Sequence, residues 1–274
     1  MKIAVTGASG FLGRYVLQEL EKRNISTIAV SRSEKDNNSS NDSNVQWVQL
    51  DIAHHSDSYF KQLYEPDILI HLAWDGLPNY KSLHHFEREL PFHYKFIATL
   101  VREGLQNIIA TGTCFEYGMQ SGPLSSNIET RPQNPYSFAK DTLHKQLQYL
   151  KSIHHFNLTW ARLFYMYGEG QSESSLFSSL KKAIDSDQKI FDMSGGEQLR
   201  DYLPVQDVAK QLVDMAVECK NRGAVNICSG SPVSVRKLVE SWIADYGWDI
   251  ELRLGTFPYP DYEPMAFWGI KEKK

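Results

Sequence analysis

Cysteine and long apolar runs are both scarce in this 274-residue sequence. The three cysteines, Cys114, Cys219 and Cys228, are odd in number and widely spaced, which indicates free thiols in a reducing compartment rather than a disulfide framework. No apolar run approaches the ~20 residues that a membrane helix needs. Because the first expected strand begins at Lys2, no room is left for a signal peptide. We therefore expect a cytoplasmic protein without a membrane segment.

A large excess of charge of one sign is absent as well. Lysine and arginine number 29 against 33 aspartates and glutamates, so the formal net charge is −4. This balance gives no reason to expect binding to nucleic acid or to an anionic membrane surface. The histidine pairs at 54–55, 84–85 and 154–155 form neither an HExxH pattern nor a Cys/His array, so we expect no metal site.

Strand and helix signals alternate along the chain, as they do in a doubly wound α/β protein with a parallel sheet. The expected strands are Lys2–Thr6, Ser26–Ser31, Val45–Leu50, Asp67–Leu72, Asn107–Thr111, Leu158–Leu163 and Ala224–Cys228. The expected helices are Leu12–Arg23, Tyr59–Tyr64, Leu83–Glu103, Ser137–His155, Leu176–Ser186 and Val205–Cys219. The polar stretch Ser33–Asn44 predicts a surface loop.

The pattern changes after Gly168, where glycine, serine and charged stretches become frequent. We predict a Rossmann-type domain formed by residues 1–164, to which residues 203–229 return. Residues 165–202 and 230–274 would then form a smaller carboxyl-terminal lobe that binds the substrate. A chain of this length can bury the substantial core that such an arrangement needs.

The first strand runs directly into a glycine-punctuated turn, Thr6-Gly-Ala-Ser-Gly-Phe-Leu-Gly13. Gly7 permits a tight turn, Gly10 lets the backbone approach a pyrophosphate, and Gly13 lets the next helix pack closely on the strand. The N–H groups of the first helical turn can then hold the anion. The spacing is GxxGxxG rather than GxGxxG. It predicts a dinucleotide site, with an ordinary strand–turn–helix as the alternative.

A second motif, Tyr136-Ser-Phe-Ala-Lys140, stands in mid-chain behind the helix start signal Asn134-Pro135. Residues four apart share a helix face, so the phenol of Tyr136 and the ammonium of Lys140 point the same way. Upstream, the hydroxyl of Thr113 follows a buried strand in a turn and could bond a reacting oxygen. Tyr136 as helix packing, Lys140 as surface charge and Thr113 as a turn hydroxyl form the alternative interpretation.

These segments, in this order, resemble the extended short-chain dehydrogenase/reductase family, in its branch of nucleotide-sugar epimerases, dehydratases and reductases. The resemblance covers nearly the whole chain. It is carried by TGASGFLG (6–13), LDI (50–52), HLAW (71–74), TGTCFEYG (111–118), YSFAK (136–140), RLFYMYGEGQ (162–171) and RDYLPVQDVA (200–209). It implies that Thr113, Tyr136 and Lys140 are the catalytic set.

The resemblance also implies a set of cofactor contacts. They are Gly7, Ser9, Gly10, Phe11, Leu12, Gly13, Ser31, Arg32, Asp51, Ile52, Leu72, Ala73 and Lys140. Within this set, Asp51 would bond the adenine amino group, and Leu72 and Ala73 would line the path of the dinucleotide. The second strand ends in Ser31 and Arg32 and has no carboxylate there. An acid at that point would repel a 2′-phosphate, whereas a guanidinium binds one. We therefore predict NADP(H) over NAD(H), with a solvated loop arginine as the alternative.

Departures from the family pattern narrow the expected reaction and leave the substrate pose open. Cys114 and Phe115 stand where dehydratases of the family carry an Asp-Glu pair, so dehydration is not expected. Tyr165 replaces an asparagine that usually bonds substrate phosphate. Arg200 matches a position that meets the nucleotide diphosphate in relatives, although a salt bridge between lobes is its alternative role.

We therefore expect NADPH-dependent reduction of a nucleotide-diphospho-4-keto-6-deoxysugar. Tyr136 would donate the proton, Lys140 would lower the pKa of Tyr136, and Thr113 would orient the substrate oxygen. A 4-epimerase with tightly held NAD and a non-catalytic NADP-binding sensor or scaffold are the alternatives. The resemblance further implies a role in polysaccharide biosynthesis and a homodimer formed through the helices Leu83–Glu103 and Ser137–His155.

Overall fold

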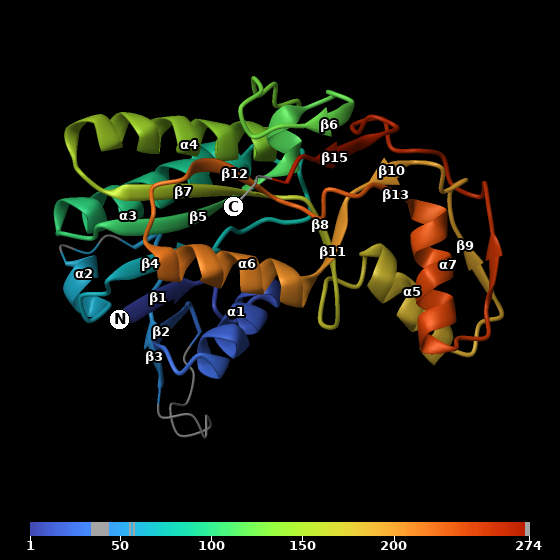
Figure 1. Ribbon diagram of the computed structural model, residues 1–274, viewed down its shortest axis with the longest axis horizontal. Coiled ribbons are helices and arrows are strands. Elements are labelled where there is room, and N and C mark those ends of the chain that lie inside the picture. The colour runs from blue at the N-terminus through green and yellow to red at the C-terminus, as the bar shows by residue number, and fades with distance from the viewer. Residues whose placement is uncertain (34–43, 55, 57, 272–274) are drawn as a thin grey trace.

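A seven-stranded parallel sheet forms the centre of the protein (Figure 1). The computed structural model describes residues 1–33, 44–54, 56 and 58–271. The strand order is β12-β7-β5-β4-β1-β2-β3. The strands are β1 (Lys2–Thr6), β2 (Ser26–Ser31), β3 (Val45–Gln49), β4 (Ile68–His71), β5 (Asn107–Thr113), β7 (Asn157–Leu163) and β12 (Gly223–Ile227). Each expected strand is present within a few residues of its expected bounds. Apart from its two ends, the expected loop Ser33–Asn44 lies outside the described residues.

Helices cover both faces of this sheet, which confirms the doubly wound Rossmann-type fold. One face carries α1 (Phe11–Lys22) and α6 (Val205–Glu218), and the other carries α2 (Tyr59–Gln62), α3 (Leu90–Arg102) and α4 (Pro135–Ile153). Successive residues of β1 divide between two buried clusters, with Ile3 and Val5 in one and Ala4 in the other. This division explains why the strands read as continuous apolar runs, because both faces are buried.

The expected helix Leu83–Glu103 begins as a π-helical segment, η2 (His85–Glu89), and continues as α3. Pro91 lies at the start of α3 and has no backbone N–H to bond the carbonyl of Glu87. The wider turn leaves His85 and Glu89 buried, at 0% and 8% exposure. Both side chains therefore point into the protein, next to the end of β4.

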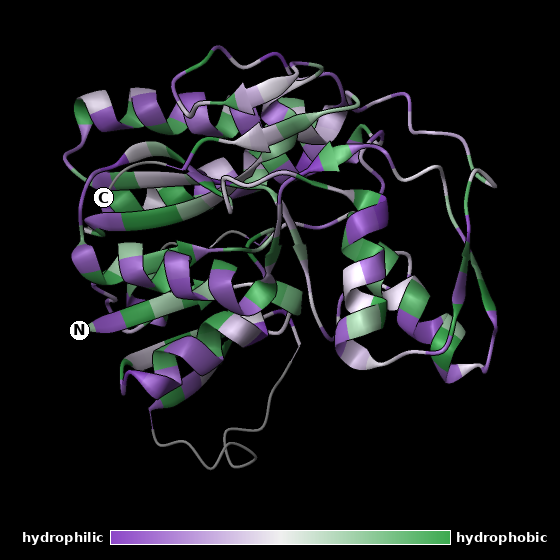
Figure 2. Cartoon of the chain, turned by 45° about the vertical axis from the view of Figure 1, so that its right-hand side comes forward, coloured by the Kyte–Doolittle hydropathy of each residue, from purple (hydrophilic) through white to green (hydrophobic). Residues whose placement is uncertain are grey.

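A second group of elements lies to the side of the sheet (Figure 1). It contains α5 (Leu176–Asp185), α7 (Val235–Tyr246) and a parallel pair of short strands, β9 (Ile190–Asp192) and β14 (Glu251–Arg253), around a core of its own. Figure 2 shows apolar and polar residues alternating along its helices, the pattern of amphipathic helices. The sequence analysis missed α7, although its cap residues were visible: Ser234 accepts a bond from the Lys237 N–H at 3.2 Å, and Gly247 ends it in a left-handed conformation.

Short strand pairs join the two groups. They are β8 (Tyr165–Tyr167) with β11 (Tyr202–Pro204), β10 (Leu199–Arg200) with β13 (Val233–Ser234), and β6 (Gly122–Leu124) with β15 (Phe267–Gly269). The segment β12 returns to the sheet beside β7, as expected. Among the described residues, no helix combines the length and apolar character that crossing a bilayer requires.

Candidate active site

The glycine turn stands at the carboxyl end of β1 and closes against the end of β4. Gly7 has φ +70°, and a Cβ there would lie 2.8 Å from the Ala73 nitrogen, so only glycine fits. The N–H of Gly10 donates to the Gly7 carbonyl at 3.0 Å, and Gly10 then begins α1 without a side-chain cap. The first N–H groups of a helix have no partner within the helix. They can therefore bind an anion at this point.

A cleft of about 420 Å³ opens over this turn, along the carboxyl ends of β1, β2 and β4. It is lined by all of the predicted cofactor residues except Lys140: Gly7, Ser9, Gly10, Phe11, Leu12, Gly13, Ser31, Arg32, Asp51, Ile52, Leu72 and Ala73. The fold thus brings together residues from separate parts of the chain, and their contacts with a cofactor stay a prediction. Further lining residues that the sequence analysis missed are Trp74, Asp75, His84, Arg88, Glu89, Phe92 and His93.

Arg32 meets an acidic partner in this cleft. Its Nη1 lies 3.0 Å from Oδ2 of Asp75, in the loop after β4, and this hydrogen bond holds the pKa of Asp75 below its usual value. Ser31 accepts a bond from the Ser33 N–H at 3.2 Å and lies 3.4 Å from the hydroxyl of Ser9. The sequence analysis missed Asp75 because Arg32 and Asp75 belong to different strand ends. The guanidinium that we expected to bind a 2′-phosphate is therefore already paired with the carboxylate of Asp75.

Thr113 and Tyr136 meet at the carboxyl end of β5. The strand continues to Thr113, rather than ending at Thr111, because residues up to Thr113 pair in register with β7. Tyr136 follows the N-cap Asn134 at the start of α4 and is 8% exposed. Burial raises the pKa of Tyr136 well above its ordinary value, and a hydrogen bond with the Thr113 side chain opposes this shift. A lowering of the pKa of Tyr136 by Lys140 stays a prediction.

Lys140 is buried one helical turn from Tyr136. Its Nζ donates to the Thr111 carbonyl at 2.9 Å and lies 4.0 Å from the centroid of the Trp74 ring. Burial lowers the pKa of Lys140 to about 7, and the carboxylates of Glu116 and Glu89 oppose that shift. The ammonium is therefore held at the end of β5, on the same side of the sheet as Tyr136.

Aromatic side chains surround Tyr136. Its ring centroid lies 5.5 Å from that of Tyr80, 5.3 Å from that of His85 and 6.1 Å from that of Trp74. The N–H of Tyr136 also donates to the Tyr80 carbonyl at 3.2 Å. A second cleft, of about 640 Å³, adjoins this cluster. It is lined by Phe11, Leu77, Pro78, Asn79, Tyr80, Lys81, Asn134, Gln171, Ser172, Ser174, Ser175 and Tyr262.

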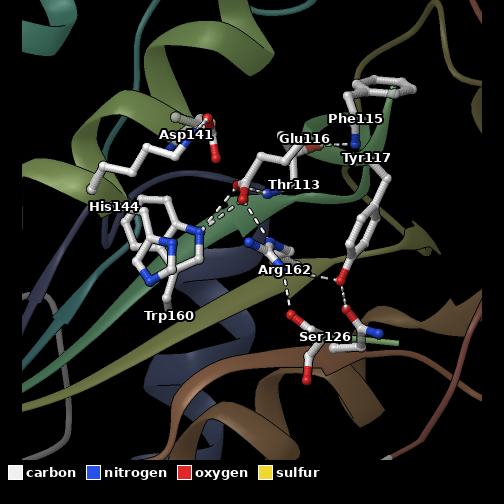
Figure 3. A network of polar contacts seen from close by, with 12 residues as sticks. Thr113, Phe115, Glu116, Tyr117, Ser126, Asp141, His144, Trp160 and Arg162 are labelled. Atoms are coloured by element: carbon white, nitrogen blue, oxygen red, sulfur yellow. Dashed lines mark hydrogen bonds and ion pairs between the residues drawn. The ribbon is translucent and has the colours of Figure 1, made fainter. Parts of the chain in front are cut away.

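Glu116 lies in a polar network beneath Thr113 (Figure 3). Its side chain is fully buried, and it accepts bonds from Arg162 Nε at 2.6 Å, from Trp160 Nε1 at 3.1 Å and from the Thr113 N–H at 2.9 Å. Burial raises the pKa of Glu116, and the adjacent Arg162 opposes that rise. The network thus fixes the end of β5 and leaves this carboxylate without a free face for proton transfer to a substrate.

Two of the three predicted substrate contacts, Tyr165 and Arg200, lie where the sheet meets the smaller group of elements. Arg200 is 2% exposed; its Nη2 lies 2.9 Å from Glu263 Oε2, and Nη1 donates to the carbonyls of Leu199 and Met265. The Tyr165 ring lies between Phe115 and Tyr202. A diphosphate could reach Arg200 only if Glu263 released it. Contacts of Tyr165 and Arg200 with substrate therefore stay predictions.

Comparisons with known proteins agree with this geometry. Residues 3–228 match the NAD dependent epimerase/dehydratase family. The chain belongs to this family. As a family member it is an NAD(P)-dependent enzyme of the extended short-chain dehydrogenase/reductase type.

Similar proteins of this family include enzymes named for the 4-position of nucleotide sugars. The chain is 32% identical to dTDP-6-deoxy-L-talose 4-dehydrogenase (NAD(+)) from Aggregatibacter actinomycetemcomitans, over 99% of this chain and 100% of that protein. It is 22% identical to dTDP-4-dehydro-6-deoxyglucose reductase from Escherichia coli, over 87% of this chain and 80% of that one. The structure of MoeE5 in complex with UDP-glucose and NAD has the same fold, with a TM-score of 0.82 and 23% identity over 100% of this chain and 90% of that one.

Proposed function

We propose that the protein reduces the keto group of a nucleotide-diphospho-4-keto-6-deoxysugar. The observation that carries this proposal is the meeting of Thr113, Tyr136 and Lys140 at one end of β5. Their neighbours Tyr80 and Trp74 line the two clefts. The names of the two family members above support the substrate class, because a 4-dehydrogenase and a 4-keto reductase interconvert the same two groups in opposite directions. The protein would then act on carbon 4 of a deoxysugar.

The residues of the glycine turn suit the cofactor that this reaction requires. The uncapped start of α1 would hold its pyrophosphate. Gly7 lets the turn close against the backbone of Ala73, which a Cβ would prevent. Bound NADPH would supply the hydride. The protein's own part is then to hold the substrate oxygen and to provide a proton.

Tyr136 would provide that proton. Its burial raises its pKa, so the phenol stays protonated at neutral pH, as a proton donor must. Thr113 would share the hydrogen bonding of the substrate oxygen, since its side chain already bonds Tyr136. Lys140, buried next to the same strand end, would stabilise the negative charge left on Tyr136 after transfer.

We further propose that NADP(H) is preferred over NAD(H). The support is Arg32 at the mouth of the cofactor cleft and a hydroxyl, Ser31, where a ribose-binding carboxylate would otherwise stand. Asp75 opposes this preference, because a 2′-phosphate must compete with its carboxylate for the guanidinium. The related 4-dehydrogenase is named for NAD(+), so the preference has to be measured on this chain.

Further proposals concern the rest of the molecule. We propose that residues 165–202 and 230–274 form the lobe that receives the substrate, in the cleft of about 640 Å³. A homodimer through α3 and α4 is supported by apolar side chains exposed on α4: Phe138 at 49%, Tyr149 at 78% and Ile153 at 78%. Sedimentation of the wild type and of Tyr149→Glu would test it. A cytoplasmic location is supported by the small, odd number of cysteines.

The deciding experiment mixes purified protein with a nucleotide-linked 4-keto-6-deoxyhexose and either NADPH or NADH. Loss of the absorbance of the reduced nicotinamide would show the reductase, and a faster rate with NADPH would support the role of Arg32. An absence of oxidation together with interconversion of 4-epimeric nucleotide sugars would replace this proposal with the 4-epimerase. Cofactor binding without any turnover would replace it with a sensor or scaffold.

A further inference from the structure

Trp74 lines the cofactor cleft. It is the last residue of the HLAW segment, and the family resemblance implies no role for it. It lies three residues after the end of β4 and is partly buried. The Nζ of Lys140 lies 4.0 Å from the centroid of its ring, within the distance at which an aromatic face attracts a cation. The buried ammonium also donates to the Thr111 carbonyl at 2.9 Å. An ammonium carries three donors, so the ring is a substantial part of its surroundings.

The indole is held in place from two sides. His93 stacks on it with a centroid distance of 4.5 Å and an interplanar angle of 16°. Its Nε1–H donates to His85 Nδ1 at 3.1 Å, and the other ring nitrogen of His85 lies 2.8 Å from the Asn79 carbonyl. Because a carbonyl only accepts, His85 must donate from Nε2 and accept at Nδ1. It is therefore a neutral imidazole in the tautomer that suits Trp74.

A polar chain fixes His93 in turn. Its Nε2 lies 3.1 Å from a carboxylate oxygen of Glu89, and its Nδ1 lies 2.7 Å from His71 Nε2. The remaining nitrogen of His71 lies 2.8 Å from the Thr6 hydroxyl. With Glu89 as the final acceptor, every hydrogen bond in the chain points from Thr6 towards Glu89, and both imidazoles are neutral. Burial lowers the pKa of His93 to about 4 and that of His71 well below its ordinary value, which agrees with neutral rings.

Several ionisable side chains surround Lys140. Glu116 at the end of β5 and Glu89 of η2 favour its charged form, whereas burial disfavours it. His71 of β4, His85 of η2 and His93 of α3 are neutral and so contribute no repulsion. Together with the Thr111 carbonyl, the indole of Trp74 is therefore in direct contact with the ammonium and can offset its loss of water.

We propose that Trp74 is a positioning residue for Lys140, holding the ammonium against the end of β5 with its ring face and keeping it charged. The catalytic importance of Lys140 rests on the proposed function. The contact between Trp74 and Lys140 does not depend on that function. Replacement of the ring by an aliphatic side chain removes an attraction made only with the charged form. The pKa of Lys140 then falls by about one unit, given the strength of a desolvated cation–π contact.

The test follows the ¹³Cε resonance of Lys140 in the full-length protein, labelled with ¹³C-lysine, across a pH titration. Loss of the signal in Lys140→Arg assigns it. Trp74→Leu should titrate about one unit below the wild type, whereas Trp74→Phe, which keeps a smaller ring face, should fall less. Trp248→Leu makes the same substitution in the ring that stacks on Tyr246, at a centroid distance of 4.6 Å, and should leave the Lys140 titration unchanged.

Equal shifts in Trp74→Leu and Trp74→Phe would overturn the proposal, because packing rather than the ring face would then set the pKa. An unchanged pKa, or a rise caused by water entering the space, would overturn it too. If the leucine variant fails to fold, the phenylalanine variant still decides, since a fall in the pKa of Lys140 is expected there as well. The titration needs no substrate. Its result therefore tests this proposal independently of the proposed reaction.

Discussion

The guanidinium of Arg162 lies 2.6 Å from a carboxylate oxygen of Glu116, and neither side chain is more than 4% exposed. Arg162 belongs to β7 and Glu116 to the short 3-10 helix η3 (Cys114–Tyr117), so this ion pair joins β7 to the segment directly after β5. The same guanidinium donates to the Tyr117 hydroxyl at 3.1 Å and to the Ser126 carbonyl at 2.9 Å (Figure 3). The pair therefore fixes the carboxyl end of β5, next to Thr113.

Removal of Arg162 should destabilise the protein strongly. Arg162→Ala leaves the carboxylate of Glu116 buried without its cation, which costs about 3 kcal/mol or more in the free energy of unfolding. Urea unfolding followed by circular dichroism measures the loss. Arg131→Ala, which breaks the exposed ion pair with Glu129, is the control and should change little. Equal stability of the two variants would show that the buried pair is not a support.

The role of Tyr136 predicts a loss of turnover without a loss of cofactor. Tyr136→Phe keeps the ring among its aromatic neighbours and removes only the proton donor. Turnover should fall about a hundredfold or more if proton donation is the main contribution. Tyr149→Phe removes a hydroxyl from an exposed tyrosine of the same helix and should leave turnover unchanged. Fluorescence titration with NADPH should give similar affinities for all three proteins, and a normal rate in Tyr136→Phe would remove Tyr136 from the mechanism.

The ion pair of Arg32 and Asp75 predicts opposite changes in cofactor preference. Arg32→Ala should weaken binding of NADPH about tenfold relative to NADH, because a charge-assisted bond to the 2′-phosphate is lost. Asp75→Asn should strengthen NADPH binding, since the guanidinium no longer has a competing carboxylate. The ratio of kcat/KM for the two cofactors measures both effects. An unchanged ratio in Arg32→Ala would show that this arginine is a solvated loop residue.

The buried neutral histidines predict a loss of stability in mild acid. Burial lowers the pKa of His93 and of His144 to about 4, below the unfolded value of 6.5, so the unfolded chain binds more protons between these values. Stability therefore falls as the pH drops below about 6.5, by about 2 kcal/mol for each such histidine between pH 7 and pH 5. Glu89 acts in the same direction at lower pH: although burial alone would raise its pKa, hydrogen bonds from His93 and the Asp75 N–H lower it to about 2.

Urea unfolding at pH 7 and pH 5 measures this dependence. His144→Gln offers the cleanest variant, because His144 stacks on Trp160 away from the clefts. It should reduce the difference in unfolding free energy between the two pH values. A wild-type protein as stable at pH 5 as at pH 7 would contradict the neutral assignment of these rings.

Substitutions of two glycines with similar backbone angles distinguish the cost of backbone strain from the cost of a steric clash. Gly7 has φ +70° and Gly223 has φ +65°, but a Cβ on Gly7 would meet the Ala73 nitrogen at 2.8 Å, whereas one on Gly223 would meet nothing within 4 Å. Gly223→Ala should cost about 1 kcal/mol for the left-handed conformation alone. Gly7→Ala should cost more and should also weaken cofactor binding. Thermal unfolding and NADPH titration of both variants provide the comparison.

The local parts of this structure could be predicted from the sequence. The strands that are buried on both faces appear in the sequence as apolar runs, and the glycine motif indicates a tight turn. The spacing of Tyr136 and Lys140 places both on one face of α4. These features depend on neighbours in the chain, so their physical causes are visible in short stretches. The missed helix α7 belongs to this class, because Ser234 and Gly247 mark its two ends.

Only the tertiary structure decided which charges and rings meet. Arg32 finds Asp75, Lys140 finds Trp74, and Arg200 finds Glu263, each from a segment distant in the chain. Such pairs arise where the carboxyl ends of parallel strands converge and where the last residues fold back on the sheet. The pKa of a buried group depends on the same convergence, because burial and partner charges come from several elements at once. The sequence therefore determined which ionisable residues are present, whereas the packing set their partners and their pKa values.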